Sequence, residues 1–238
     1  MKAACLALAL VALAVPAQAQ MAWTDQGFVN VNFGGQAGSR TLNTGTTFDL
    51  YGEQGSLDTS QDIGGGAFFD FSAGYKVWRN LALGAGYSRV KNDNDVAISA
   101  RVPDPNIFDR PRSVTGTSPG ANHSEDVFYF TGTWMIPVTD VLDVGLSFGP
   151  AIFQVTQDVP TAITVSEPSA AISGTTIAQR KKTTAGIAFG VDVNYFFTER
   201  FGAGGLMRYT WGSADLEGAT DSLTVGGFQI GAGLRVRF

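Results

Sequence analysis

The C-terminal segment from Leu223 to Phe238 alternates strictly between two kinds of residue. Every second position from Phe228 to Phe238 is apolar, and the positions between carry glycine, glutamine and two arginines. Successive side chains of a strand point to opposite faces, so this strand has one apolar wall and one wall of glycine and cations. Such a polar wall suits the lumen of a narrow barrel, and the apolar wall suits lipid. The segment therefore predicts a transmembrane β-strand.

The first 19 residues have the features of a secretory signal. Lys2 precedes an apolar stretch, and Ala17-Gln18-Ala19 forms a small-x-small cleavage site. We therefore expect residues 1–19 to be removed during export, together with Cys5, the only cysteine of the chain. No segment offers the roughly 18 consecutive apolar residues of a transmembrane helix, so a membrane span has to be built from strands.

The composition agrees with a sheet that is half lipid-facing and half polar. Charged residues make up 16% of the chain, against roughly 25% in ordinary soluble domains, and 30 of the 238 residues are glycine. The formal net charge of −5 argues against nucleic acid as a partner.

The same two-faced alternation recurs in eight segments, joined alternately by short turns and long polar connections. The segments lie near residues 29–33, 67–77, 81–87, 128–136, 142–148, 187–197, 201–211 and 223–238. The short turns are Arg79-Asn80, Pro137 to Asp140 and Thr198 to Arg200, and the long loops lie near 37–63, 91–125, 156–183 and 213–222. We predict an all-β protein: an eight-stranded, antiparallel, up-and-down transmembrane β-barrel over residues 20–238, with the long loops extracellular and both termini at the turn end.

A soluble eight-stranded carrier would have an apolar lumen and a polar exterior. Here charged residues fall on the lumen face, which argues for the opposite arrangement. We expect a filled lumen, because an eight-stranded barrel is only wide enough for its own side chains. Asp192 and Arg208 lie on neighbouring strands at similar distances from one turn, so we predict that they form an ion pair. The other expected lumen charges are Asp70, Lys76, Asp143, Arg235 and Arg237.

Two motifs carry a resemblance to a known family: GGFQIGAGLRVRF at 226–238 and GYKVWRNLALGAGYSR at 74–89. With the architecture, they make the chain similar to the small OmpA/OmpX-like outer-membrane barrels of Gram-negative bacteria, described as the outer membrane protein β-barrel domain. The resemblance implies a place in the bacterial outer membrane. It also implies that Phe238, Val236, Leu234 and Ala232 form the signal read by the outer-membrane insertion machinery.

Catalytic and metal-binding motifs are weak in this sequence. His123, the only histidine, stands beside Ser124, but adjacent residues of a strand point to opposite faces, so the two do not converge. The run Asn92-Asp93-Asn94-Asp95 lacks the glycine and distal glutamate of a calcium loop, and we expect a solvated turn. We therefore predict no catalytic residues, no metal and no cofactor.

The long loops carry the remaining functional signals. Alternation at Phe48, Leu50 and Val96 to Val102 predicts that the first three hairpins continue as ribbons above the membrane. The basic run Arg180-Lys181-Lys182 lies near the expected plane of lipopolysaccharide phosphates and is a candidate contact for them, with a solvated loop tip as the alternative.

The expected function is a structural or adhesion-like surface-interaction role, with outer-membrane lipid, lipopolysaccharide and a surface partner as contacts. A narrow channel for ions or small solutes and an outer-membrane lipid enzyme remain as alternatives.

Overall fold

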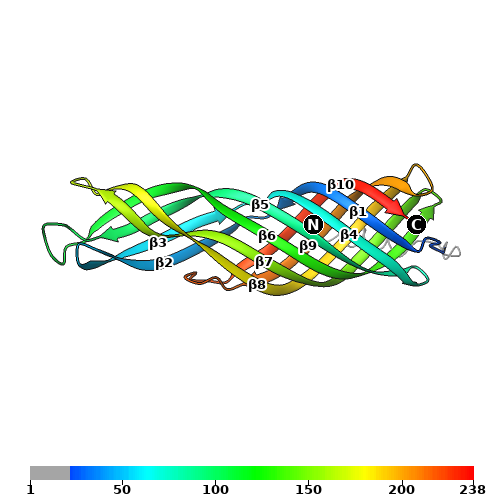
Figure 1. The fold of residues 1–238 in the computed structure, drawn as a ribbon, viewed down its shortest axis with the longest axis horizontal. Coiled ribbons are helices and arrows are strands. Elements are labelled where there is room, and N and C mark those ends of the chain that lie inside the picture. The colour runs from blue at the N-terminus through cyan, green and yellow to red at the C-terminus, as the bar shows by residue number, and fades with distance from the viewer. Residues whose placement is uncertain (1–21) are drawn as a thin grey trace, which may run out of the picture.

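The computed structural model describes residues 22–238, so the expected signal at 1–19 lies outside the described residues. Ten strands follow one another: β1 (Gly27–Ala37), β2 (Arg40–Leu50), β3 (Glu53–Ile63), β4 (Gly66–Trp78), β5 (Leu81–Val102), β6 (Arg112–Thr139), β7 (Leu142–Ser166), β8 (Ala171–Phe196), β9 (Phe201–Ala214) and β10 (Leu223–Arg237). Figure 1 shows them forming one elongated, twisted tube. No helix between residues 22 and 238 could cross a membrane.

Eight of the strands close into a ring. The antiparallel order is β5-β4-β1-β10-β9-β8-β7-β6, and β6 pairs back to β5. The seam between the two ends of the chain is a regular ladder from Phe28 opposite Arg237 to Ala37 opposite Phe228. The predicted eight-stranded antiparallel barrel is confirmed, and closure leaves no unpaired edge in this part of the sheet.

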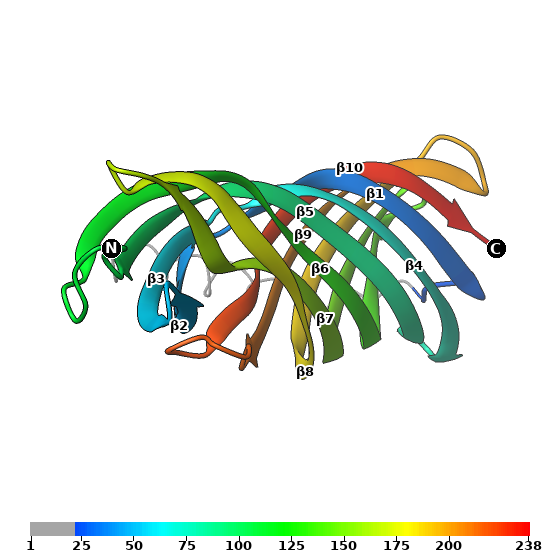
Figure 2. The same cartoon turned by 60° about the vertical axis from the view of Figure 1, so that its left-hand side comes forward.

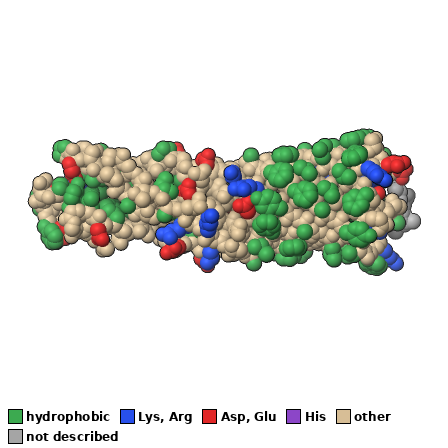
Figure 3. All heavy atoms as spheres, viewed as in Figure 1, with side chains coloured by type: hydrophobic (Ala, Val, Ile, Leu, Met, Phe, Trp, Pro, Cys, Tyr) green, Lys and Arg blue, Asp and Glu red, His purple; other side chains and the backbone are tan. Residues whose placement is uncertain are grey.

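The two faces of the ring are oriented as the alternation predicts. Phe33 and Leu234 point outward and are 62% and 65% exposed, whereas Asp70 and Arg235 point inward and are 0% and 1% exposed. Figure 3 shows the outward apolar side chains gathered as a green band over one half of the tube, with a belt of blue and red charges at its inner boundary. An apolar band with polar flanks is the exterior of a barrel that lies in a bilayer.

Both described ends of the chain lie at the end of the barrel that carries the short turns. The backbone amides of Gln26 and Gly27 donate to the carbonyl oxygen of Phe238 over 2.6 and 2.9 Å. The three predicted turns are found after β4, β6 and β8, at the same end of the ring.

The other half of the tube, beyond the apolar band, is a projection made of hairpins. β5, β6, β7 and β8 have 22, 28, 25 and 26 residues, compared with 13 for β4 and 14 for β9. The β2–β3 hairpin lies outside the ring and pairs with the upper part of β5, from Ser56 opposite Arg101 to Gln61 opposite Val96. Figure 2 shows β2 and β3 beside this end of the ring. The expected ribbons above the membrane are confirmed.

The expectation of a solvated turn at Asn92 to Asp95 is wrong. These residues belong to β5, and Asn92 to Asn94 pair with His123 to Ala121 of β6 before a register shift between Asn94 and Val96. The polar run was mistaken for a turn because its residues have low intrinsic strand preference. Pairing on a long hairpin overrides that preference. The chain turns later, in the proline-containing segment 103–111.

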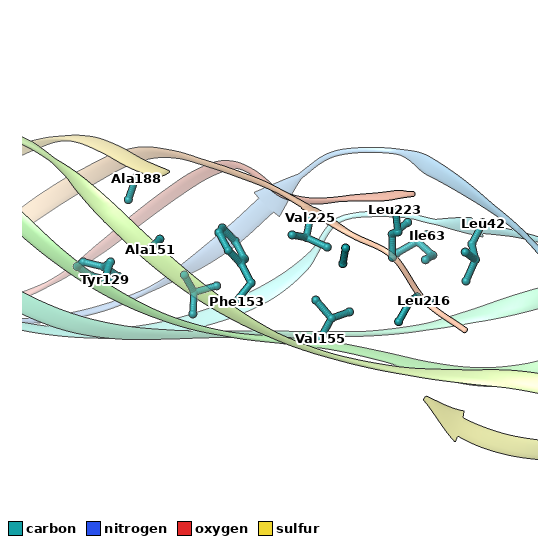
Figure 4. Packing of buried hydrophobic residues seen from close by; sticks show 12 residues of the cluster. Leu42, Ile63, Tyr129, Ala151, Phe153, Val155, Ala188, Leu216, Leu223 and Val225 are labelled. Atoms are coloured by element: carbon teal, nitrogen blue, oxygen red, sulfur yellow. The ribbon is translucent and has the colours of Figure 1, made fainter. Parts of the chain in front are cut away.

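The interior is not polar throughout. Above the charged lumen, inward side chains form an apolar cluster that includes Val127, Phe153, Val155, Val225 and Leu42. Figure 4 shows this cluster running along the axis of the tube from Tyr129 past Phe153 to Leu216 of the β9–β10 connection, with Leu42 of β2 at its far end. A second cluster around Leu57, Ile98 and Ile163 fills the projection. The projection is therefore a packed structure with its own core, and burial of these side chains holds its hairpins together.

Candidate functional site

The centre of the lumen is an ion pair with a hydrogen-bonded surround. Arg208 of β9 donates to Asp70 of β4 over 2.5 Å, and both side chains are buried. Asp70 also accepts from the Tyr129 hydroxyl at 2.6 Å and from the Asn32 amide at 2.9 Å. The Arg208 guanidinium lies 4.1 Å from the centre of the Tyr129 ring. Four strands thus contribute to one group of contacts, which satisfies charges that would be costly to bury alone.

A second arginine continues this network toward the turn end. Arg235 of β10 donates to Asp192 over 3.2 Å, to Asn194 over 2.6 Å and to Asn32 over 2.6 Å. Since Asn32 donates to Asp70 and accepts from Arg235, it joins the two ion pairs. The result is a continuous layer of polar contacts across the barrel.

The predicted Asp192–Arg208 ion pair is wrong. The register places Asp192 opposite Leu206 and Gly190 opposite Arg208, so the two residues are diagonal neighbours, as expected. However, Arg208 turns across the lumen to Asp70, and Asp192 meets Arg235. A hairpin register shows only which residues share a strand pair. Beyond this hairpin, β10 lies next to β9, and closure of the ring brings β4 within reach of Arg208.

The remaining predicted lumen charges lie at the turn end. Arg237 lies 3.5 Å from Asp143 and 3.4 Å from Asp25, a residue of the segment before β1. Lys76 donates to the backbone oxygen of Trp23 over 2.5 Å. The segment that contains Trp23 and Asp25 therefore covers this mouth of the barrel, and it explains why these charges need no partner on a neighbouring strand.

The opposite mouth is held by a buried carboxylate that our sequence analysis missed. Glu125 forms an ion pair with Arg40, which also donates to the carbonyl oxygen of Gly226. The Gly226 amide donates to the Glu125 carboxylate over 3.1 Å. The Nε2 atom of His123 lies 3.1 Å from the other oxygen of that carboxylate. Glu125, Val127 and Tyr129 are alternate residues of one strand, so their side chains point to the same inward face. The alternation could therefore have identified Glu125 as a lumen residue. Arg40 lies in a segment expected to be a loop, so no alternation marked its side chain as inward-facing.

His123 and Ser124 are on opposite faces, as expected. His123 is buried in the lumen, where its ring nitrogens contact Gln157 at 2.7 Å and Glu125 at 3.1 Å, and Ser124 lies on the outer wall. These contacts leave the imidazole enclosed by its own chain. Within residues 22–238, no group of three or more His, Cys, Asp or Glu side chains could hold a metal ion.

Little space remains in the charged part of the lumen. The cavity bordered by Asn30, Asp192 and Arg208 has a volume of about 20 Å³, which is room for about one water molecule. Glycines make this packing feasible: a Cβ atom at Gly86 would lie 2.2 Å from the Tyr129 ring, and one at Gly204 would lie 2.7 Å from Arg235 Nε. The structure therefore has a filled lumen.

The tips of the three hairpins meet at the end of the tube opposite the short turns, which we call the apex (residues 51–53, 104–112 and 167). Arg112 donates to both carboxylate oxygens of Glu167, over 2.7 and 2.6 Å, and the Tyr51 hydroxyl donates to the same carboxylate over 3.0 Å. The Asp109 amide donates to Glu53 over 2.6 Å. The hydrogen bond from Arg112 lowers the pKa of the Glu167 carboxyl below its ordinary value. The apex is therefore a set of loops tied to one another.

The three residues of the basic run Arg180-Lys181-Lys182 lie in different surroundings on β8. Arg180 forms an ion pair of 2.7 Å with Glu217 of the β9–β10 connection. Lys181 and Lys182 instead border a groove on the outer wall of the barrel. Of the residues expected to form the insertion signal, Phe238, Leu234 and Ala232 are exposed and Val236 is half-buried.

A closed ring with a charged, filled lumen and an apolar exterior band defines an integral membrane protein of the β-barrel class. The model of the family described as "Outer membrane protein beta-barrel domain" matches residues 5–236. The chain belongs to this family and is a protein of the bacterial outer membrane.

The chain is also similar to solved bacterial structures. The outer membrane protease OmpT from Escherichia coli is 11% identical, with a TM-score of 0.50, and the match covers 93% of this chain and 99% of OmpT. Neisserial surface protein A is 13% identical, with a TM-score of 0.49 and coverage of 89% and 97%. At these identities the likeness extends to the fold alone. Among curated protein sequences, none matches the chain significantly.

Proposed function

We propose that this protein is an adhesion-like surface-interaction protein, in which the barrel anchors the projection and the projection presents the apex to a partner. The observation that carries this proposal is the joining of three hairpin tips through Tyr51, Arg112 and Glu167. Loops that only connect strands need no contacts between their tips. Loops held in one arrangement lose less conformational entropy when they bind, which favours recognition.

The apex also offers contact residues. Phe108 is 81% exposed, and the neighbouring Ile107 and the Tyr51 ring are each 47% exposed. Arg110 and Asp109 stand beside them in the sequence. Exposed aromatic and aliphatic side chains surrounded by charges are typical of the centre and rim of a protein interface.

A binding assay tests this proposal. Bacteria without adhesins of their own would display the protein, and their attachment to a fixed epithelial cell layer would be counted. We expect the double substitution Ile107→Ser and Phe108→Ser to reduce attachment by at least about tenfold. Ile177→Ser is the matched control, because Ile177 is 44% exposed on β8 away from the apex. Equal attachment by the wild type and the apex variant would contradict the proposal.

The filled lumen supports binding rather than transport. A continuous path for ions would need the Asp70–Arg208 and Asp192–Arg235 pairs to separate, which exposes buried charges. We therefore expect no single-channel conductance from the purified protein in planar bilayers. Regular conductance steps that change on Arg208→Met would favour the channel alternative. The enclosed His123 likewise supports binding rather than lipid hydrolysis.

A further inference from the structure

The outer wall of β5, β6, β7 and β8 carries a groove of about 520 Å³ just above the apolar band. Figure 3 shows blue and red charged side chains at the boundary between the green band and the projection. We call this groove the collar groove. Its polar lining residues include Arg89, Lys91, Ser124, Asp126, Gln154, Thr156, Asp158, Lys181 and Lys182.

The strand register arranges these residues in rows. Lys91 pairs with Ser124, Ser124 with Thr156, and Thr156 with Lys181. One row thus has an ammonium group at each end and two hydroxyl groups between them. With neighbouring strands about 4.8 Å apart, the two lysine Cα atoms are separated by roughly 14 Å. At this separation both lysine side chains are long enough to contact one bulky anionic headgroup that lies between them.

The rows below this one lead into the apolar band. Two residues nearer the membrane, the row contains Arg89, Asp126, Gln154 and Thr183. Two residues closer still to the membrane, the row of outward-facing side chains contains Tyr87, Phe128, Ile152 and Ala185. The Tyr87 and Phe128 rings of this row lie 5.0 Å apart. Polar groups in the groove therefore give way to apolar ones on the outer wall next to it, in the direction in which a lipid changes from headgroup to acyl chain.

Three carboxylates border the groove: Asp126 and Asp158 accept contacts from other side chains, and Asp93 is exposed, whereas the lysines have no ion-pair partner among the described residues. Asp126 lies 3.5 Å from Arg89 and accepts from the Tyr87 hydroxyl at 2.5 Å, and Asp158 accepts from the side chain of Asn122 at 3.0 Å. By contrast, Lys91 and Lys181 have no ion-pair partner within residues 22–238. The groove therefore offers unpaired positive charge beside hydroxyl and amide groups.

We propose that the collar groove binds a phosphorylated glycolipid of the outer leaflet, the lipid A part of lipopolysaccharide, through Lys91 and Lys181. The two ammonium groups contact phosphate, Ser124 and Thr156 contact phosphate or sugar oxygens, and the acyl chains lie on Phe128 and Ile152. This inference rests on the outer-membrane placement of the barrel. It is independent of the apex and of any partner there.

The test uses the refolded barrel in phospholipid nanodiscs, titrated with lipid A that carries two phosphates. We expect Lys91→Gln with Lys181→Gln to weaken binding roughly 10-fold to 30-fold, given the attraction of each cation to an anionic surface. The double substitution Arg101→Gln and Arg110→Gln is the control, because it removes the same charge from exposed positions on the projection. Heat-modifiable migration on a gel confirms that each variant is folded.

Two further arms identify the chemical group that is recognised. Dephosphorylated lipid A is expected to bind the wild type and the lysine variant equally and weakly. Inorganic phosphate at millimolar concentration is expected to leave lipid A binding unchanged, because it lacks the acyl chains. Wild-type affinity in the lysine variant, or full displacement by inorganic phosphate, would overturn the proposal. Attachment through the apex is expected to be unchanged in the lysine variant, so failure of one proposal does not imply failure of the other.

Discussion

Arg208 of β9 and Asp70 of β4 lie 2.5 Å apart across the lumen, although β1 and β10 separate their strands in the ring. The pair therefore connects opposite walls of the barrel and exists only when the ring is closed. Both residues are buried, so neither charge can be compensated by water if the other is removed.

Removal of one member of this pair is predicted to be costly. Asp70→Ala leaves the Arg208 guanidinium buried without its counter-ion, and we expect a loss of about 3–5 kcal/mol in the free energy of unfolding. The measurement is urea unfolding of the barrel in lipid vesicles, followed by tryptophan fluorescence. Adding Arg208→Met should recover much of the loss. The exposed Arg89–Asp126 pair is the control, for which Arg89→Ala should cost at most about 1 kcal/mol. Equal losses at the two sites would contradict the prediction.

Gly86 is predicted to be required by the Tyr129 ring. Its Cβ position lies 2.2 Å from that ring, so Gly86→Ala should displace Tyr129 from Asp70 and destabilise the barrel by about 1–3 kcal/mol. Gly132→Ala is the matched control, because its nearest atom is 3.9 Å away. Replacing Tyr129 with leucine in the Gly86→Ala variant should relieve the clash. If it does not, the ring is not the cause of the destabilisation.

Arg40 is predicted to fasten the β2–β3 hairpin to the barrel mouth. Arg40→Ala removes the ion pair with the buried Glu125 and the hydrogen bond to Gly226. We expect chymotrypsin to cleave after Tyr51, at the tip of this hairpin, about tenfold faster, since cleavage follows the population of the locally opened state. Arg110→Ala, a change at an exposed position in the β5–β6 connection, should leave the rate unchanged. Cleavage at the wild-type rate would show that other contacts fasten the hairpin.

The apex is predicted to loosen in acid. The pKa of Glu167 is lowered in the folded state by its hydrogen bond from Arg112, so the contact contributes fully above the ordinary value of 4.5. That contribution is lost as the pH falls below 4.5 through the lowered folded-state value. Spin labels on cysteines at positions 54 and 169 would report the distance between two hairpin tips. We expect this distance distribution to broaden between pH 6 and roughly pH 3. Glu167→Gln should be broad at both pH values, and a wild-type distribution unaffected by pH would contradict the prediction.

The membrane part of this fold could be predicted because its signal is local. Alternation places every second residue from Phe228 to Phe238 on the lipid face, whichever strand lies beside it. The dipeptide Arg79-Asn80 indicates a turn without reference to any distant segment. An even number of such strands places both termini at one end of the barrel. The filled lumen follows from its narrow width.

The contacts inside the lumen could not be predicted in the same way. Asp192 and Arg208 are neighbours on one hairpin, yet each takes a partner from outside it: Arg235 of β10, and Asp70 of β4, which only the β1–β10 seam brings near. Asn92 to Asn94 form a strand because β6 pairs with them, although their own preferences favour a turn. The apolar core around Phe153 depends on which inward residues share one level, which the stagger between strands sets.

The seam between β1 and β10 makes the barrel one cooperative unit. Asn32 of β1 accepts a hydrogen bond from Arg235 of β10, and the same arginine forms an ion pair with Asp192 of β8. Without β10, the strands β1 and β9 would each present an unpaired edge to lipid, and Asp192 would lose its counter-ion. The first and last strands of the ring therefore have to pair before its exterior suits a bilayer.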